Sequence, residues 1–188
     1  ELEPLEHGDE EPGAGRPDHV EREHANVCVE IGERSPAHLD RALDGLGLPM
    51  SPFNLLRLVG PAVAFHVSET MHAAFPDRFY VSDSMRALVA AGKTAIYTKD
   101  ESGTLVIDPE VAALFVRGDL PLTSEQVRDR ALDAMADEVR RMLDEGVVAE
   151  PQDIDLCMLL GAGWPFHLGG ITPYLDRTGT SERVTGAR

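Results

Sequence analysis

Two glycine pairs are the first residues in this sequence whose types and spacing could do chemistry. Gly45-Leu-Gly47 and Gly161-Ala-Gly163 have the spacing that opens a dinucleotide-binding loop, in which backbone N–H groups contact a pyrophosphate. The third glycine of such a loop is replaced by Met50 in one pair and by Phe166 in the other. Both pairs also follow a helical pattern, whereas a dinucleotide-binding loop follows a strand. We therefore predict two helix ends at these glycines, and we assign no cofactor-binding residue.

Two Glu-x-x-His pairs have the spacing that places a carboxylate and an imidazole on one helix face, as in di-iron bundles. They are Glu21 with His24 and Glu69 with His72. A di-iron centre needs two further glutamates on neighbouring helices, so a solvated helix edge is the favoured interpretation, and we assign no metal ligand. The di-iron interpretation stays open as the least favoured one.

Single polar residues near the predicted helix ends are the remaining candidates. Asp40, Asp155 and Asp176 recur at helix starts or turns, which favours capping and hydrogen bonds between helices over catalysis. His167 follows Pro165-Phe166 at a glycine corner and has no paired carboxylate, so a structural role is favoured there too. The sequence therefore yields no catalytic residue.

Local signals predict a mainly α-helical chain with one small β-hairpin. Proline in the first turn, apolar residues at helical spacing and a glycine stop mark most of the helices. Thr123-Ser-Glu-Gln126 is a capping box, which predicts a long helix up to Gly146. β-Branched and aromatic residues on either side of residues 100–103 predict a hairpin over about 94–108. The other predicted helices cover 36–46, 52–59, 61–74, 84–91 and 151–160, of which 61–74 is expected to lie in the core.

Charge and composition exclude several classes of protein. Asp and Glu together number 33 against 17 Lys and Arg, so we expect neither a nucleic-acid surface nor one for anionic membranes. No apolar run approaches the ~20 residues of a membrane helix. The two cysteines have no metal or disulfide spacing, which fits a cytoplasmic protein. The acidic residues 1–18 are expected to be disordered and residues 180–188 to form a flexible tail.

An internal repeat relates residues 35–60 to residues 150–179. In each copy a proline, an apolar residue and an aspartate precede an apolar stripe, a Gly-x-Gly pair and a Pro-Phe pair. The alignment places Pro52-Phe53 opposite Pro165-Phe166. Phe53 and Trp164 then lie at equivalent corners, either as core anchors or as the wall of an acyl groove. Each copy ends on a Leu-x-x-x-Gly turn. The repeat predicts two related helical units packed face to face.

These helix corners resemble a known family. "GLGLPMSPF" followed by "LLRLVG", and "GAGWPFHLGG" followed by "YLDRTG", are similar to the C-terminal domain of 3-hydroxyacyl-CoA dehydrogenases. The resemblance is closest to the multifunctional fatty-acid β-oxidation proteins, which carry that domain as a tandem pair. It covers about residues 36–179 and includes "GKTAIYTKD" in the hairpin. It implies a first helical repeat over 19–118, with an atypical first helix, and a second repeat over 119–179.

The resemblance also implies a function. Members of the family oxidise an L-3-hydroxyacyl-CoA to the 3-ketoacyl-CoA with NAD, and their nucleotide-binding fold and catalytic residues lie upstream of this domain. We therefore expect this chain to form the substrate side and the dimerisation surface of such an enzyme, with the catalytic half absent and no cofactor bound by the chain alone.

The partners implied are an acyl-CoA substrate and an NAD-binding domain or subunit, and a homo-oligomer is expected. The alternative is a stand-alone, non-catalytic helical module for docking or dimerisation. The expected substrate-side or interface residues are those of the two corners: Gly47, Pro49, Met50, Pro52 and Phe53 in the first, and Gly161, Gly163, Trp164, Pro165, Phe166 and His167 in the second.

Overall fold

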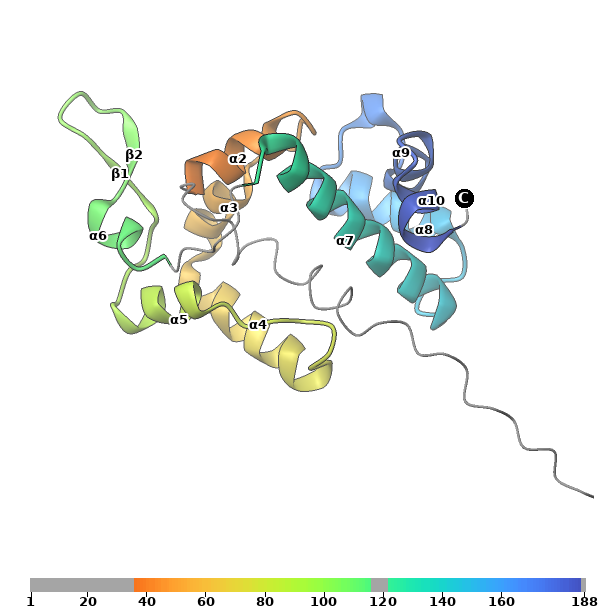
Figure 1. Cartoon of the computed structure of the whole chain (residues 1–188), viewed down its shortest axis with the longest axis horizontal. Coiled ribbons are helices and arrows are strands. Elements are labelled where there is room, and N and C mark those ends of the chain that lie inside the picture. Colours follow the sequence, from red (N-terminus) through yellow and green to blue (C-terminus); the bar gives the residue numbers. More distant parts are fainter. Residues whose placement is uncertain (1–35, 116–121, 187–188) are drawn as a thin grey trace, which may run out of the picture.

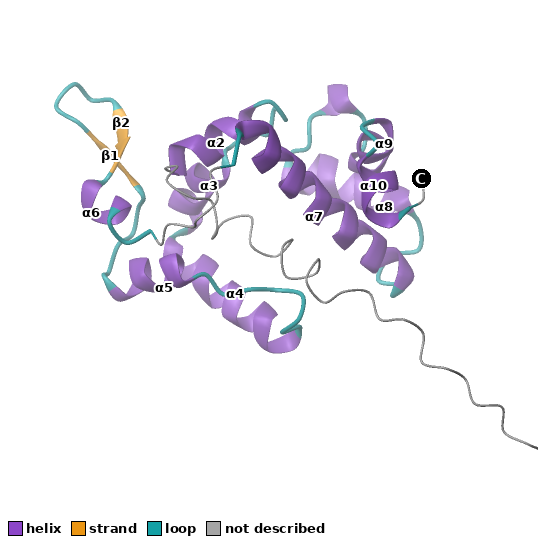
Figure 2. Cartoon of the chain, in the orientation of Figure 1, coloured by secondary structure: helices purple, strands orange, loops and turns teal. Residues whose placement is uncertain are grey.

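The computed structural model describes residues 36–115 and 122–186, and these residues form a mainly helical molecule with one β-hairpin. Figure 1 shows the hairpin projecting at one end and the last three helices gathered at the other, and Figure 2 shows how little of the chain is strand. The elements are α2 (Pro36–Asp44), α3 (Pro52–Val59), α4 (Pro61–Ala74), α5 (Asp83–Ala90), β1 (Tyr97–Lys99), β2 (Leu105–Ile107), α6 (Pro109–Ala112), α7 (Ser124–Asp144), α8 (Pro151–Cys157), a π-helical turn (Met158–Ala162), a 3₁₀ turn (Phe166–Leu168), α9 (Ile171–Arg177) and α10 (Thr180–Thr185).

Local signals in the sequence account for most of these boundaries. Proline occupies the first turn of α3, α4, α6 and α8, where its missing N–H has no intrahelical partner to lose. The predicted capping box starts α7: Thr123 Oγ1 accepts from the Gln126 N–H at 3.2 Å, and Gln126 Oε1 accepts from the Thr123 N–H at 2.8 Å. The hairpin pairs Tyr97 with Ile107, within the range predicted for it.

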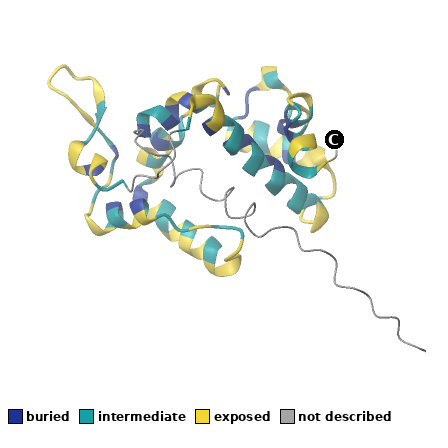
Figure 3. Cartoon of the chain, viewed as in Figure 1, coloured by how far each residue is buried: buried dark blue, intermediate teal, exposed yellow. Residues whose placement is uncertain are grey.

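Two hydrophobic cores hold the helices together, and α2 and α7 contribute to both. The first core joins α2, α3, α5, the hairpin, α6 and the start of α7 around Leu88, Ile96 and Val111. The second joins the end of α2, the middle of α7, α8 and α9 around Trp164 and Leu175. Figure 3 shows the buried residues concentrated where these elements meet. Helix α7 therefore links the two parts of the molecule.

Two predictions about individual segments were wrong. Residues 61–74 were expected in the core because the segment is rich in apolar residues, yet in α4 only Pro61 is buried. Residues 180–188 were expected to form a flexible tail, yet Thr180–Thr185 form α10, which packs on α7, and Arg183 pairs with Asp133. Packing on a distant helix stabilises α10, and no local signal in the sequence shows it. The predicted disordered segment 1–18 lies outside the described residues.

Candidate functional site

The two glycine corners contact each other, and the contacts are reciprocal. Gly47 lies against Pro165, where a Cβ added to the glycine would be 3.4 Å from the proline Cγ. Gly163 lies against Pro49, where an added Cβ would be only 2.7 Å from Cγ. Both glycines have a left-handed backbone, with φ of 69° and 73°, as expected for glycines that end a helix. The two copies of the repeat thus meet corner to corner, in a pseudo-two-fold arrangement.

Two buried or half-buried aspartates fix the register of the repeat. Asp40 Oδ1 accepts from the Phe53 N–H at 3.0 Å, in the first turn of α3. Asp155 Oδ1 accepts from the Thr172 N–H at 2.8 Å, in the first turn of α9. Both carboxylates therefore satisfy an N-terminal N–H group of the next helix, which confirms the capping prediction for these two residues. Asp155 also accepts from the Thr172 hydroxyl at 2.8 Å.

This register corrects the sequence alignment of the two corners. Phe53 corresponds to Thr172 and not to Phe166, and Trp164 corresponds to Leu48. Exposure agrees, because Phe53 is 6% exposed and Phe166 is 75% exposed. The Pro-Phe pairs at 52 and 165 were similar in sequence only.

Two short insertions in the second copy explain why the alignment slipped. The π-helical turn Met158–Ala162 makes the path from the capping aspartate to the corner glycine one residue longer than in the first copy. The 3₁₀ turn Phe166–Leu168 then makes the path from the corner proline to the capped N–H three residues longer. An alignment that looks for identical residues at similar spacing does not detect these insertions.

The predicted corner residues divide into a buried and an exposed set. Phe53 packs edge-on against Phe115 at 6.0 Å between ring centroids, and Trp164 packs against Tyr174 at 5.3 Å, so both anchor cores. Met50 and Phe166 are exposed. His167 is exposed and lies beside the Gly47 corner, and Pro52 occupies the first turn of α3. Gly161 lies in the π-helical turn.

Asp40 also anchors the hairpin, a role that the sequence analysis missed. The Tyr97 hydroxyl donates to Asp40 Oδ2 at 2.6 Å, so one carboxylate joins α2, α3 and β1. Burial of the phenol, together with the hydrogen bond to Asp40, raises the pKa of Tyr97 well above its usual range. A cavity of about 380 Å³ opens beside this bond. It is lined by Ala37, Asp40, Arg41, Asp44, Ser51, Asn54, Tyr97 and Leu105.

The described Glu-x-x-His pair does not form a metal site. Glu69 lies 3.8 Å from Arg86, and His72 Nδ1 lies 2.6 Å from the Phe79 carbonyl oxygen. Within residues 36–115 and 122–186, no group of three or more His, Cys, Asp or Glu side chains could hold a metal ion. The other pair, Glu21 with His24, lies outside the described residues. No helix in the described part of the chain is long and apolar enough to cross a membrane.

The corner glycines do not fit a dinucleotide either. Each follows a helix, and the space in front of Gly47 and Gly163 is filled by the proline of the other copy. The sheet seen in the described residues is a two-stranded antiparallel hairpin, which lacks the parallel βαβ unit of a dinucleotide fold.

Comparisons with known proteins agree with this geometry. Residues 22–102 match the family model described as 3-hydroxyacyl-CoA dehydrogenase, C-terminal domain. The chain contains this domain. Over 162 residues it is 30% identical to the fatty acid oxidation complex subunit alpha of Acinetobacter baumannii strain SDF, an alignment that covers 78% of this chain and 23% of that protein. The subunit of the same name from Shewanella amazonensis is 30% identical over 158 residues, which cover 78% of the chain and 22% of the relative.

Solved structures show the same fold for this 3-hydroxyacyl-CoA dehydrogenase C-terminal domain. The 3-hydroxybutyryl-CoA dehydrogenase of Escherichia coli K12 superimposes with a TM-score of 0.57 at 18% identity, over 91% of this chain and 56% of that one. The dehydrogenase part of multifunctional enzyme 1 from C. elegans superimposes with a TM-score of 0.53 at 16% identity, over 90% and 43% of the two chains. The chain spans less than a quarter of the length of the curated relatives given above.

Proposed function

We propose that this chain is the substrate-side helical domain of a 3-hydroxyacyl-CoA dehydrogenase of fatty-acid oxidation. Such an enzyme converts an L-3-hydroxyacyl-CoA to the 3-ketoacyl-CoA with NAD. The observation that carries the proposal is the family match over residues 22–102. The paired corners support it, because they join two related helical units, as the tandem repeat of that family implies.

Under this proposal, NAD is held by a domain or subunit other than the described residues. The basis is the poor fit of the corner glycines to a dinucleotide. The chain also has 33 acidic residues against 17 basic ones, with only two lysines, Lys93 and Lys99, and CoA phosphates favour basic groups. Lys93 is already paired with Asp108 and Glu110. The described part of the chain would therefore supply an apolar wall and would leave most of the charge recognition to its partner.

An exposed apolar surface on one copy supports docking of such a partner. Five aliphatic side chains of α3 and α4, on the two sides of the Gly60 break, are all exposed, and we call them the apolar strip: Leu55, Leu58, Val59, Val63 and Val67. The register set by the aspartate caps gives their counterparts in the second copy, which are mostly polar: Tyr174, Arg177, Thr178, Glu182 and Gly186. Since only one copy is apolar here, folding of the repeat does not require the strip, which favours contact with another surface.

Activity in trans tests the proposal. L-3-hydroxybutyryl-CoA and NAD are supplied to the purified chain, alone and mixed with the nucleotide-binding part of the Acinetobacter baumannii relative, and NADH absorbance is followed. We expect no NADH from the chain alone and NADH from the mixture. NADH from the chain alone would show that it holds NAD itself, and none from either would favour the non-catalytic docking module.

A matched pair of variants tests the docking surface. Leu58 and Leu160 are both 71% exposed, but only Leu58 lies on the apolar strip. Leu58→Ser should raise the concentration of nucleotide-binding domain needed for half-maximal activity, and Leu160→Ser should not. Equal effects of the two changes would rule out the strip as the docking surface.

Two further measurements test the remaining parts of the proposal. Light scattering gives the molar mass of the purified chain in solution and so tests the proposed homo-oligomer. Fractionation of cells tests the proposed cytoplasmic location.

A further inference from the structure

Helix α4 is the helix with the fewest apolar anchors in the described part of the chain. It has 14 residues, yet it contributes none to either hydrophobic core. Its described contacts are with its neighbours α3 and α5. On the α5 side, the Arg86 guanidinium lies 5.2 Å from the centre of the Phe65 ring and 3.8 Å from Glu69. Segments with so few buried apolar contacts open locally at a lower free energy than the rest of a protein.

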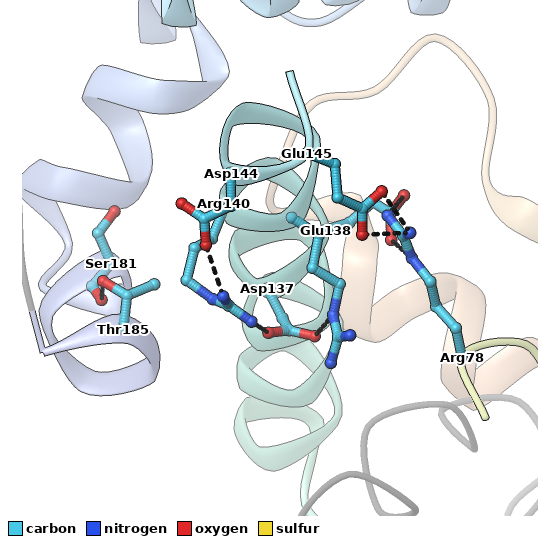
Figure 4. Close-up of polar contacts among 9 residues, drawn as sticks. Arg78, Asp137, Glu138, Arg140, Asp144, Glu145, Ser181 and Thr185 are labelled. Atoms are coloured by element: carbon cyan, nitrogen blue, oxygen red, sulfur yellow. Dashed lines mark hydrogen bonds and ion pairs between the residues drawn. The ribbon is translucent and has the colours of Figure 1, made fainter. Parts of the chain in front are cut away.

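A second attachment holds the far end of α4, and it is ionic. Arg78 lies in the loop between α4 and α5 and reaches α7, more than fifty residues away in the sequence (Figure 4). Its Nε and Nη2 donate to the two carboxylate oxygens of Glu138 at 2.9 and 2.7 Å. Its Nη1 donates to both oxygens of Glu145, at 3.1 and 3.2 Å. The Arg78 side chain is 14% exposed, so these are charge-assisted bonds with limited access to water.

The loop around Arg78 transmits this attachment to α4. The guanidinium lies 5.6 Å from the Phe75 ring centre and 5.8 Å from that of Phe79, within the range of cation–π attraction. The Phe79 carbonyl oxygen lies 2.6 Å from His72 Nδ1 in the last turn of α4. The Arg78 and Phe79 N–H groups both donate to the Phe75 carbonyl, so the loop is folded tightly behind the guanidinium.

We propose that Arg78 is an ionic latch: it holds the C-terminal end of α4 on α7, and when it releases, α4 opens as a unit while both cores stay folded. Gly60, which joins α3 to α4, supplies the hinge, because its φ is 93° and nothing lies within 4 Å of the position that a Cβ would take. Glu138 and Glu145 are 41% and 49% exposed, so dissolved salt can reach the acidic side of the latch. Val63 and Val67 move with α4, so the latch controls part of the apolar strip.

Hydrogen exchange of the full chain, measured by mass spectrometry, tests the latch without any assumption about activity. Arg78→Gln should speed amide exchange in residues 61–74 about tenfold, as expected for loss of a charge-assisted pair and its aromatic contacts. Exchange in residues 151–177 should not change. Arg140→Gln is the matched control, because Arg140 pairs only with Asp137 and Asp144 of α7 itself among the ion pairs of the described residues. Arg140→Gln should leave the amide exchange rates of residues 61–74 unchanged.

The acidic partners give a second test that does not depend on how well the arginine variant folds. Glu138→Gln combined with Glu145→Gln should also speed exchange in 61–74. Adding Arg78→Gln to that pair should have a smaller effect than it has in the natural chain, because only the aromatic contacts of Arg78 are then left to lose. Raising the salt from about 0.05 to about 0.5 M should speed exchange there in the natural chain but not in the variants. Unchanged exchange in 61–74, or equal acceleration in 151–177, would overturn the proposal.

Discussion

The contact between Gly163 and Pro49 predicts that one methyl group will separate the two copies of the repeat. In Gly163→Ala the new Cβ would lie 2.7 Å from Pro49 Cγ and 3.2 Å from Cδ, closer than carbon atoms pack. The proline ring is stiff, so the corners must move apart. The backbone adds a second cost, because φ at this position is 73°.

A matched glycine separates these two costs. Gly146 has nearly the same backbone, with φ of 67°, but nothing within 4 Å of its Cβ position. Gly146→Ala should therefore cost only the left-handed penalty, about 1–2 kcal/mol of the free energy of unfolding. Gly163→Ala should add the cost of overpacking, about 1–3 kcal/mol, for a total of about 2–5 kcal/mol.

The assay is urea unfolding followed by far-UV circular dichroism and by the fluorescence of Trp164, the single tryptophan of the chain. Pro49→Ala removes Cγ and Cδ and leaves Cβ, 3.8 Å from the new methyl group, which is an ordinary contact. In the double variant the two changes should therefore couple favourably, by about 1–2 kcal/mol. If Gly163→Ala costs no more than Gly146→Ala, or if its cost is unchanged by Pro49→Ala, the corner-to-corner contact does not hold the copies together as argued.

Substitutions at three further positions test the buried polar and aromatic anchors. Gly170→Ala would place a Cβ 2.2 Å from Asp155 Cγ with an ordinary backbone, so it should displace the α9 cap and lower the free energy of unfolding in urea by about 2–4 kcal/mol. Tyr97→Phe should cost about 1 kcal/mol at neutral pH through the lost bond to Asp40. Because folding raises the pKa of Tyr97, the natural chain should lose stability as the pH rises above about 10, and a pH series of urea midpoints should show less of that loss in Tyr97→Phe. Trp164→Ala should cost about 3–5 kcal/mol and Trp164→Phe clearly less in thermal unfolding, because the buried indole N–H has no acceptor among the described residues.

The sequence predicted the elements whose signals are local. Helix α4 begins at Pro61 and ends at Ala74, the predicted limits, because a glycine precedes it, a proline occupies its first turn and an aromatic–proline pair follows it. Helix α7 begins at its capping box. Neither signal depends on anything more than a few residues away, so both could be found without the structure.

The site was harder to predict because its contacts are not local. The pairing of Tyr97 with Asp40 spans 57 residues, and that of Arg78 with Glu138 spans 60. No register for such pairs can be read from the sequence, and periodicity does not reveal a π-helical turn that adds one residue. The sequence alignment therefore paired Pro52-Phe53 with the identical residues Pro165-Phe166. The structural equivalent of Phe53 is instead Thr172, whose N–H group is capped by Asp155.

Comparison of the two copies of the repeat distinguishes the residues that folding requires from the residues that can vary without affecting the fold. Both copies keep the residues that make the corner: an aspartate that caps the next helix, a left-handed glycine and a proline that packs on the glycine of the other copy. The exposed faces of α3 and α9 are not kept, since Leu58 in one corresponds to Arg177 in the other. A feature present in both copies is explained by packing alone, whereas a large apolar residue exposed in only one copy has no role in that packing. The apolar strip, and not the glycine corners, is therefore the part of this domain where a partner-specific role should be sought first.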